Sequence, residues 1–244
     1  MKNFGIIIEA RLASTRLPNK VIKKVKGYTL IEFLILRLKS LHNVKIILAT
    51  SKNKENIKLC NIAIKNNINY FRGSEENVLL RVLNAAKKNN IENIISITGD
   101  CPIVCPDLIH RLIKFYKKNF DNVDYVSIRN FVGGMDTQIY KTKALEKSYK
   151  LCKTRLNKEH VTLFIRQSNE FKKKFLFPAK KEILSKQWSL VVDEKKDLIL
   201  MKKIISFFIK KKNYLFNYND LILFLKDHSK LWFLNSMVNR KGDS

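Results

Sequence analysis

The sequence predicts an α/β fold with a mostly parallel sheet and helices on both faces. Two observations support this prediction. Short unbroken apolar runs, typical of strands buried on both faces, alternate with stretches whose apolar residues recur at helical spacing. Alternation of this kind forms βαβ units, and their right-handed crossovers place helices on both sides of the sheet. We therefore expect a Rossmann-like sheet with a small lobe for substrate binding or dimerisation.

The first half of the chain shows the alternation most clearly. Its strands are short apolar runs, and its helices repeat apolar residues every three or four positions. Pro106 stands near the start of the fourth helix, where its missing N–H is tolerated. In chain order, the expected elements are a strand at Phe4–Ile8, a helix at Leu30–Leu41, a strand at Val44–Ala49, a helix at Asn56–Lys65, a strand at Tyr70–Phe71, a helix at Val78–Ala86, a strand at Asn93–Thr98 and a helix at Pro106–Tyr116.

The pattern changes after about Asp124. The expected elements are strands at Tyr125–Ile128 and Thr137–Tyr140, helices at Ala144–Cys152 and Glu159–Ser168, a strand at Trp188–Val192, and helices over most of Glu194–Val238. No linker rich in Ser, Gly or Pro divides the chain. We expect one domain over residues 1–244, with residues 125–180 as the substrate-binding lobe and residues 201–244 as a helical tail.

The chain is strongly basic, with 48 Lys and Arg against 21 Asp and Glu and a net charge of +27. Such a charge raises the hypothesis of nucleic-acid or membrane binding. The lysines, however, are spread along the whole chain, and the aromatic residues fall mostly at core-type positions. We therefore expect no specific nucleic-acid partner. We recognise neither a signal peptide nor a membrane-spanning stretch, so a cytoplasmic protein without membrane contact is expected.

The segment after the first strand concentrates groups that bind phosphate. It contains Arg11, Ser14, Arg16 and Lys20. Guanidinium groups form planar forks for phosphate oxygens, and an ammonium is a compact point charge. The segment has neither the P-loop spacing nor the glycine pattern of dinucleotide folds. It predicts a polyphosphate site, with an ordinary basic surface loop as the alternative.

Two carboxylates follow two other expected strands. Asp100 comes directly after Asn93–Thr98 and its neighbour Gly99, and Asp193 directly after Trp188–Val192. Ligands bind where the carboxyl ends of parallel strands meet. Magnesium is typically held by one or two carboxylates together with substrate phosphates. The two aspartates are therefore candidate Mg²⁺ ligands, with capping of the helices that follow as the alternative.

Several motifs in order resemble those of the sugar cytidylyltransferases, which make CMP-activated acidic sugars such as CMP-Kdo and CMP-nonulosonates. Residues 10–20, ARLASTRLPNK, resemble the family signature A-R-x-x-S-x-R-L-P-x-K. The likeness is closest to the branch named after spore coat polysaccharide biosynthesis protein F, which also shows the motifs at 72–79, 98–102 and 159–162. The chain departs from the family pattern at Glu9, where Pro or Gln is usual, at Asn19 and at Asn77.

The resemblance implies transfer of CMP from CTP to an acidic sugar, with release of pyrophosphate and Mg²⁺ as the cofactor. Arg11, Lys20 and Asp100 would be catalytic, and Asp100 and Asp193 would hold the metal. The implied nucleotide-binding residues are Ala10, Arg11, Ser14, Arg16, Lys20, Thr50, Arg72 and Arg81. The implied acceptor-binding residues are Gly134, Asp136, Gln138, Glu159 and His160. A homodimer is also implied, although the periodicity carries no sign of one.

Other interpretations remain open from the residues alone. Another nucleotidyltransferase would share much of this pattern. A glycosyltransferase that uses a nucleotide sugar would want a D-x-D motif, and residues 99–101 do not provide it. A basic nucleic-acid-binding module would gather lysines and stacking aromatics on one face. Locally, Gly133 and Gly134 fit an ordinary hairpin turn, and His160 fits a structural place at the entry of a helix that starts near Asn157.

Overall fold

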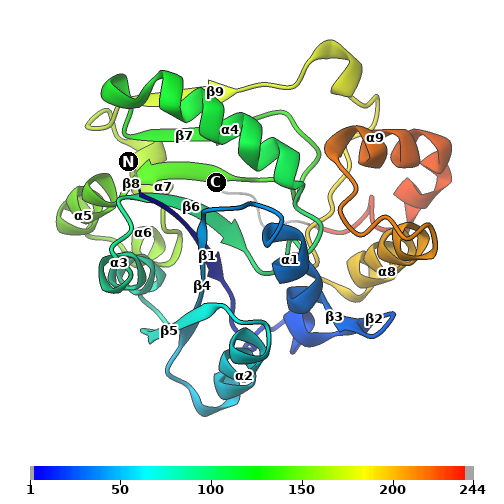
Figure 1. The fold of residues 1–244 in the computed structure, drawn as a ribbon, viewed down its shortest axis with the longest axis horizontal. Coiled ribbons are helices and arrows are strands. Elements are labelled where there is room, and N and C mark those ends of the chain that lie inside the picture. Colours follow the sequence, from blue (N-terminus) through cyan, green and yellow to red (C-terminus); the bar gives the residue numbers. More distant parts are fainter. Residues whose placement is uncertain (1–2, 240–244) are drawn as a thin grey trace.

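A seven-stranded sheet forms the centre of the protein in the computed structural model, which describes residues 3–239 (Figure 1). The strands lie in the order β5 (Asn69–Gly73), β4 (Lys45–Ser51), β1 (Phe4–Glu9), β6 (Asn93–Thr98), β8 (Gln138–Lys141), β7 (Tyr125–Ile128) and β9 (Lys173–Leu176). Two short strands, β2 (Lys24–Val25) and β3 (Tyr28–Thr29), form a separate antiparallel pair.

The central strands run parallel, which confirms the predicted sheet. β1 pairs in parallel with both β4 and β6, and β4 pairs in parallel with β5. Only β8 runs antiparallel to its neighbours, β6 and β7. The chain first builds outward from β1 on one side, and then returns to place β6 on its other side. Such a switch opens a crevice at the carboxyl ends of the two strands.

Helices cover both faces of the sheet, also as predicted. One face carries α1 (Leu30–Leu38), α2 (Ile57–Lys65) and α4 (Pro106–Lys118), with α8 (Lys195–Lys210) and α9 (Tyr218–Asp227) extending the same core. The other face carries α3 (Val78–Lys88), α5 (Thr142–Leu151), α6 (Arg155–Glu159) and α7 (Leu163–Gln167). Single 3₁₀ turns lie at Lys20–Ile22, Lys54–Asn56, Phe120–Asn122, Lys180–Glu182 and Ser229–Leu234.

Two of the predicted elements are wrong. The predicted helix Glu159–Ser168 is split, because α6 ends at Glu159 and His160 adopts an extended conformation before α7 begins at Leu163. His160 therefore lies at a helix end rather than at a helix entry. The predicted strand Trp188–Val192 is an irregular segment that makes a single bridge, from Ser189 to Gly133, because no neighbouring strand continues the pairing.

Residues 125–180 contribute β7, β8 and β9 to the same sheet as the first half of the chain (Figure 1). Their helices α5, α6 and α7 join α3 on one face. The role of this stretch in acceptor binding stays a prediction. Of the predicted helical tail, residues 240–244 lie outside the described part of the chain, and the rest contains most of α8, all of α9 and the 3₁₀ segment at Ser229–Leu234.

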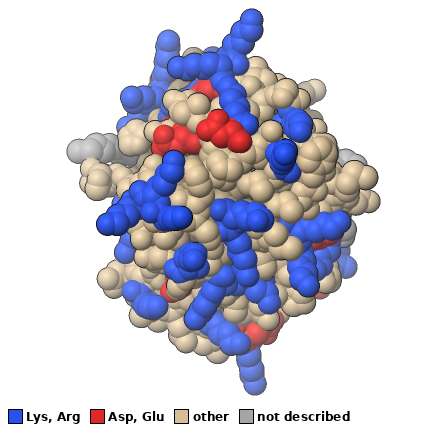
Figure 2. Space-filling view, turned by 90° about the vertical axis from the view of Figure 1, so that its right-hand side faces the viewer, with Lys and Arg blue, Asp and Glu red and all other residues tan. Residues whose placement is uncertain are grey.

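Positive side chains are spread over the face of the molecule that carries the C-terminal helices. Figure 2 shows Lys and Arg scattered across the side of the molecule that lies to the right in Figure 1, with uncharged residues between them. Solvated lysines at this density repel one another weakly through water and salt. On this face positive side chains predominate over negative ones.

Arg37 joins the first half of the fold to its C-terminal helices. Its side chain is completely buried on α1, and it donates hydrogen bonds to the carbonyls of Val104, Tyr214 and Phe216 at 3.2, 2.7 and 2.8 Å. The guanidinium also stacks on the Phe216 ring, 3.8 Å from its centroid. Burial lowers the pKa of Arg37, so its charge is held at a cost that these carbonyls offset.

Replacing Arg37 with Met should lower the free energy of unfolding by about 2 to 4 kcal/mol, because two buried carbonyls and one partly buried carbonyl lose a donor. Urea denaturation followed by circular dichroism measures this change. Arg155→Met is the matched control, since the Arg155 side chain is 81% exposed and should change stability little. Equal stability of the two variants would contradict a structural role for Arg37.

Candidate active site

A cavity of about 520 Å³ opens at the carboxyl ends of β1 and β6, and we call it the main cavity. The predicted site residues that line it are Ala10, Arg11, Ser14, Arg16, Lys20, Arg81, Asp100, Gln138, Glu159, His160 and Asp193. They come from six separate segments of the chain. The fold therefore brings together most of the groups that the sequence singles out.

Backbone hydrogen bonds hold the basic segment after β1 in place. The amide of Ala10 donates to the carbonyl of Ala49 at 3.2 Å, and the amide of Leu12 donates to the side chain of Asn56 at 2.8 Å. Asn19 has a positive φ of 58° and its amide bonds back to Leu12, which closes the segment into a loop. The loop ends in the 3₁₀ turn that begins with Lys20.

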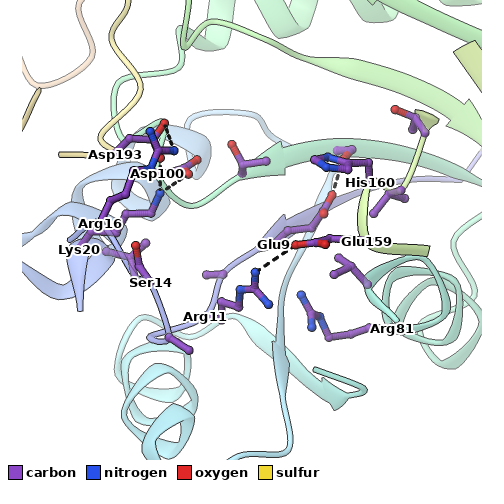
Figure 3. Close-up of a pocket in the computed structure, with 18 of the residues that line it drawn as sticks. Glu9, Arg11, Ser14, Arg16, Lys20, Arg81, Asp100, Glu159, His160 and Asp193 are labelled. Carbon is purple, nitrogen blue, oxygen red and sulfur yellow. Dashed lines mark hydrogen bonds and ion pairs between the residues drawn. The ribbon is translucent and has the colours of Figure 1, made fainter. Parts of the chain in front are cut away.

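Lys20 lies between the two predicted metal ligands (Figure 3). Its ammonium is 2.6 Å from Oδ2 of Asp100 and 2.8 Å from Oδ1 of Asp193. Arg16 contacts the other oxygen of Asp193 at 3.0 Å. Burial works to lower the pKa of Lys20, but the two carboxylates outweigh it and raise that pKa above its ordinary value. Lys20 is therefore a firmly charged ammonium.

Asp100 is positioned by a close approach of two strand ends. The amide of Gly99 donates to the carbonyl of Glu9 at 2.8 Å. A Cβ atom at position 99 would lie 2.9 Å from the Cβ of Ala10, which is closer than side chains approach. A glycine is thus required where the loop after β6 crosses the end of β1. This contact directs Asp100 toward the basic loop.

Asp193 is positioned by the segment before α8 and by the C-terminal region. The amide of Val192 donates to the carbonyl of Asp100 at 2.9 Å. The N-cap of α8 is Glu194, and the buried carboxylate of Asp197 accepts hydrogen bonds from the amides of Asp193 and Glu194. Asn235 in turn donates to Asp197 at 2.7 Å. Asp193 does not cap the helix, so its side chain reaches Lys20.

The two aspartates suit a hard divalent cation. Their carboxylate oxygens converge from separate segments on one point, and such oxygens are the ligands that Mg²⁺ prefers. Among residues 3–239, no group of three or more His, Cys, Asp and Glu side chains could hold a metal. A metal here would take its remaining ligands from water and phosphate oxygens, as Mg²⁺ commonly does.

The opposite end of the main cavity has a different character (Figure 3). Glu9, Glu159 and His160 lie there, with Arg11 between them and the aspartates. Arg11 pairs with Glu75 at 3.0 Å and with Glu159 at 3.5 Å. This end carries carboxylates and an imidazole, which can accept or exchange protons with a ligand hydroxyl.

Glu9 is a site residue to which the sequence analysis assigned no role. Its side chain lies at the end of β1, lines the main cavity and accepts a hydrogen bond from Ser96 at 2.7 Å. Burial raises the pKa of Glu9 more than Ser96 and the charge of Arg81 lower it. The available signal was a lone carboxylate that ends an otherwise apolar strand. Ser96, Thr98, Thr162 and Arg166 also line the cavity and were not predicted.

Four predicted site residues do not line the main cavity. Thr50 is fully buried at the end of β4, and Arg72 donates to the backbone carbonyl of Lys52. Gly134 packs against Leu190, and its amide donates to Asp136 at 3.0 Å. Asp136 lines an adjoining cavity of about 340 Å³, which shares Gln138 with the main one.

Arg81 is held at the base of the main cavity. Its side chain donates to the carbonyl of Ser74 at 2.6 Å, which fixes the turn before α3. Burial lowers the pKa of Arg81, while the charges of Glu9 and Glu75 work in the opposite direction. Arg81 thus contributes positive charge beside Glu9, and part of its hydrogen-bonding capacity is used by the protein itself.

A mostly parallel sheet with a basic loop and a pair of carboxylates at its carboxyl edge is the arrangement that a nucleotidyltransferase requires. The model of the cytidylyltransferase family matches residues 5–222, and the chain belongs to that family.

In the part of the chain that the structure describes, no helix is long and apolar enough to cross a membrane.

Several known proteins are similar to this chain. An uncharacterized protein of Methanocaldococcus jannaschii is 36% identical over 99% of this chain and 98% of its own length. The spore coat polysaccharide biosynthesis protein SpsF of Bacillus subtilis is 30% identical over 84% of this chain and 87% of its own. A 3-deoxy-manno-octulosonate cytidylyltransferase of Fusobacterium nucleatum is 34% identical over 50% of this chain and 49% of its own. The solved structure of a cytidylyltransferase from Leptospira borgpetersenii superposes with a TM-score of 0.88, at 29% identity and over 98% and 100% of the two chains.

Gly134→Ala should lower stability by about 3 kcal/mol or more, since Gly134 has a φ of +91° and an added Cβ would lie 2.7 Å from the backbone of Leu190. Nucleotidyltransferase turnover should fall as well, because the added Cβ displaces Leu190 and Val191, which lead to Asp193. Gly27→Ala is the matched control, with the same φ of +91° and nothing within 4 Å. It should cost only about 1 to 2 kcal/mol. Thermal melts and turnover compare the two, and equal losses would exclude the packing role.

Glu9→Gln should raise the melting temperature at pH 7 by roughly 1 to 3 °C. Because the folded-state pKa of Glu9 is raised, the folded protein holds this proton more tightly than the unfolded chain. The free energy of unfolding therefore falls as pH rises from the unfolded-state pKa of Glu9 to its higher folded-state pKa. Glutamine carries no ionisable proton, so the variant does not lose this stability. The gain should shrink near pH 4. Calorimetry at the two pH values measures it, and Glu76→Gln, whose parent side chain is 76% exposed, is the control. The same gain in both variants would contradict this origin.

Proposed function

We propose that this protein transfers CMP from CTP to an acidic sugar of the Kdo or nonulosonate type and releases pyrophosphate. The product would be a CMP-activated sugar for the synthesis of a surface polysaccharide or glycan. The observation that carries the proposal is the meeting of Lys20 and Arg16 with Asp100 and Asp193 at one end of the main cavity. That end offers cations for a triphosphate and carboxylates for its metal.

The nucleotide side of the proposal rests on the loop after β1. Arg11, Arg16 and Lys20 would bind the triphosphate oxygens, since all three line the main cavity. Ala10 and Ser14 would border the cytidine, and Arg81 would add positive charge from the far wall. Thr50 and Arg72 do not line this cavity, and Arg72 would act by holding the loop between β4 and α2 through the carbonyl of Lys52.

The reaction would proceed by in-line attack. A hydroxyl oxygen of the acceptor forms a bond to the α-phosphorus of CTP, the bond to the pyrophosphate oxygen breaks, and the hydroxyl proton passes to a base. Magnesium held by Asp100 and Asp193 would neutralise charge on the phosphate oxygens. Lys20, Arg11 and Arg16 would hold the phosphates in line and stabilise the charge that moves onto the leaving pyrophosphate.

The acceptor side rests on the opposite end of the cavity. Gln138, Glu159 and His160 line it and would bind or deprotonate the acceptor hydroxyl. Asp136 and Gly134 would contribute through the adjoining cavity. An acidic acceptor is supported by the name of the Fusobacterium nucleatum relative, and a role in polysaccharide synthesis by the name of the Bacillus subtilis relative.

A pyrophosphate-release assay tests the proposal. The protein with Mg²⁺ is offered CTP, UTP, ATP or GTP against Kdo, nonulosonates and neutral sugars. We expect release with CTP and an acidic sugar. Preference for another triphosphate, or for neutral sugars alone, would contradict the proposal.

Asp100→Asn should reduce turnover by about 100-fold or more, because the metal loses a charged ligand. Asp121→Asn, at an exposed position remote from the main cavity, is the control and should keep full activity. Circular dichroism verifies that both variants fold. Full turnover by Asp100→Asn protein would remove Asp100 from the mechanism.

A further inference from the structure

The ammonium of Lys20 occupies the point on which the two carboxylates converge. It lies 2.6 Å from Asp100 and 2.8 Å from Asp193, with its side chain only 13% exposed. Figure 3 shows Lys20 reaching from the loop after β1 to both carboxylates, with Arg16 beside them. The protein therefore supplies its own cation to this pair.

A divalent metal cannot share this position with the lysine. Oxygen ligands of Mg²⁺ lie at about 2.0 to 2.1 Å, so both carboxylates would have to turn toward the metal and away from the ammonium. Two cations held by the same pair of oxygens also repel one another strongly where water is scarce. A metal that takes Oδ2 of Asp100 and Oδ1 of Asp193 as ligands therefore requires Lys20 to leave.

The ammonium leaves readily only when another anion receives it. Lys20 stands on the same loop as Arg11 and Arg16, which line the cavity where the triphosphate is proposed to bind. Phosphate oxygens would replace the two carboxylates as partners of the ammonium. The same movement would free the carboxylates for the metal.

We propose that Lys20 is an internal counter-cation that closes the Asp100–Asp193 pair to divalent metals until a nucleoside triphosphate draws its ammonium away. This inference rests on the proposed function, since it takes that pair as the metal ligands. It adds an order to the reaction: free metal binds poorly, and metal and nucleotide bind cooperatively. By linkage, each raises the affinity of the other by the same factor.

The test measures metal binding without nucleotide or turnover. Mn²⁺, which also prefers carboxylate oxygens, is titrated into the full-length protein and followed by electron paramagnetic resonance. Lys20→Gln protein should bind Mn²⁺ at least about fivefold more tightly than the wild type. Lys23→Gln is the matched control, because it removes one positive charge from an exposed lysine three positions further along the chain. It should bind like the wild type.

Two further variants secure the interpretation. Adding Asp193→Asn to Lys20→Gln should abolish the gain, which locates the metal on the proposed pair. Lys20→Met, which keeps the apolar stem, replaces Lys20→Gln if that variant does not fold by circular dichroism. Equal Mn²⁺ affinity of the wild type and the Lys20 variant overturns the proposal, and so does an equal gain in Lys23→Gln protein.

The outcome separates this inference from the proposed function. If the counter-cation role is wrong while the function is right, the pyrophosphate assay succeeds and the Mn²⁺ affinities are equal. If the function is wrong while the role of Lys20 is right, the assay fails and the Mn²⁺ affinities still differ.

Discussion

Parallel pairing of β4, β1 and β6 is the constraint on which the rest of the structure depends. Parallel strands end at the same edge, so the segments that follow them must share one region of the surface. Helices on both faces bury these strands and leave that edge as the place where polar side chains can gather. The basic loop and Asp100 lie together because their strands are neighbours, although they are far apart in the chain.

Ion pairs then hold together the charged residues that the sheet brings close. Asp193 follows no strand, and it reaches the site through contacts of the segment before α8 with Gly133, Asp100 and Asp197. Lys20 then joins two carboxylates that lie 80 and 173 positions from it in the sequence. A half-buried cluster with both signs of charge can exist without ligand because each charge has a partner. The same pairing makes the cluster responsive to any anion that competes for the ammonium.

The sequence predicted those features that a local pattern encodes. The bounds predicted for Asn93–Thr98 and Tyr125–Ile128 match the observed strands, because strands buried on both faces are short segments dominated by apolar residues. Arg11, Lys20, Asp100 and Asp193 all line the main cavity, and their roles stay predictions. The features that the sequence did not predict depend on contacts between residues far apart in the chain. The segment Trp188–Val192 is as apolar as a strand but finds no partner strand. The raised pKa of Glu9 depends on burial beside Ser96 of β6 and Arg81 of α3. These residues are distant in the sequence, so the local pattern around Glu9 cannot predict it.

The hydrogen bond between Asn235 and Asp197 gives a residue far along the chain a part in assembling a site that begins at residue 10. During synthesis the sheet and the basic loop emerge well before Asn235, which helps to anchor the segment of Asp193. Domains acquire such long-range contacts only once the later segment is available. A chain without the segment around Asn235 would thus hold Asp197, and through it Asp193, less firmly beside the basic loop and Asp100.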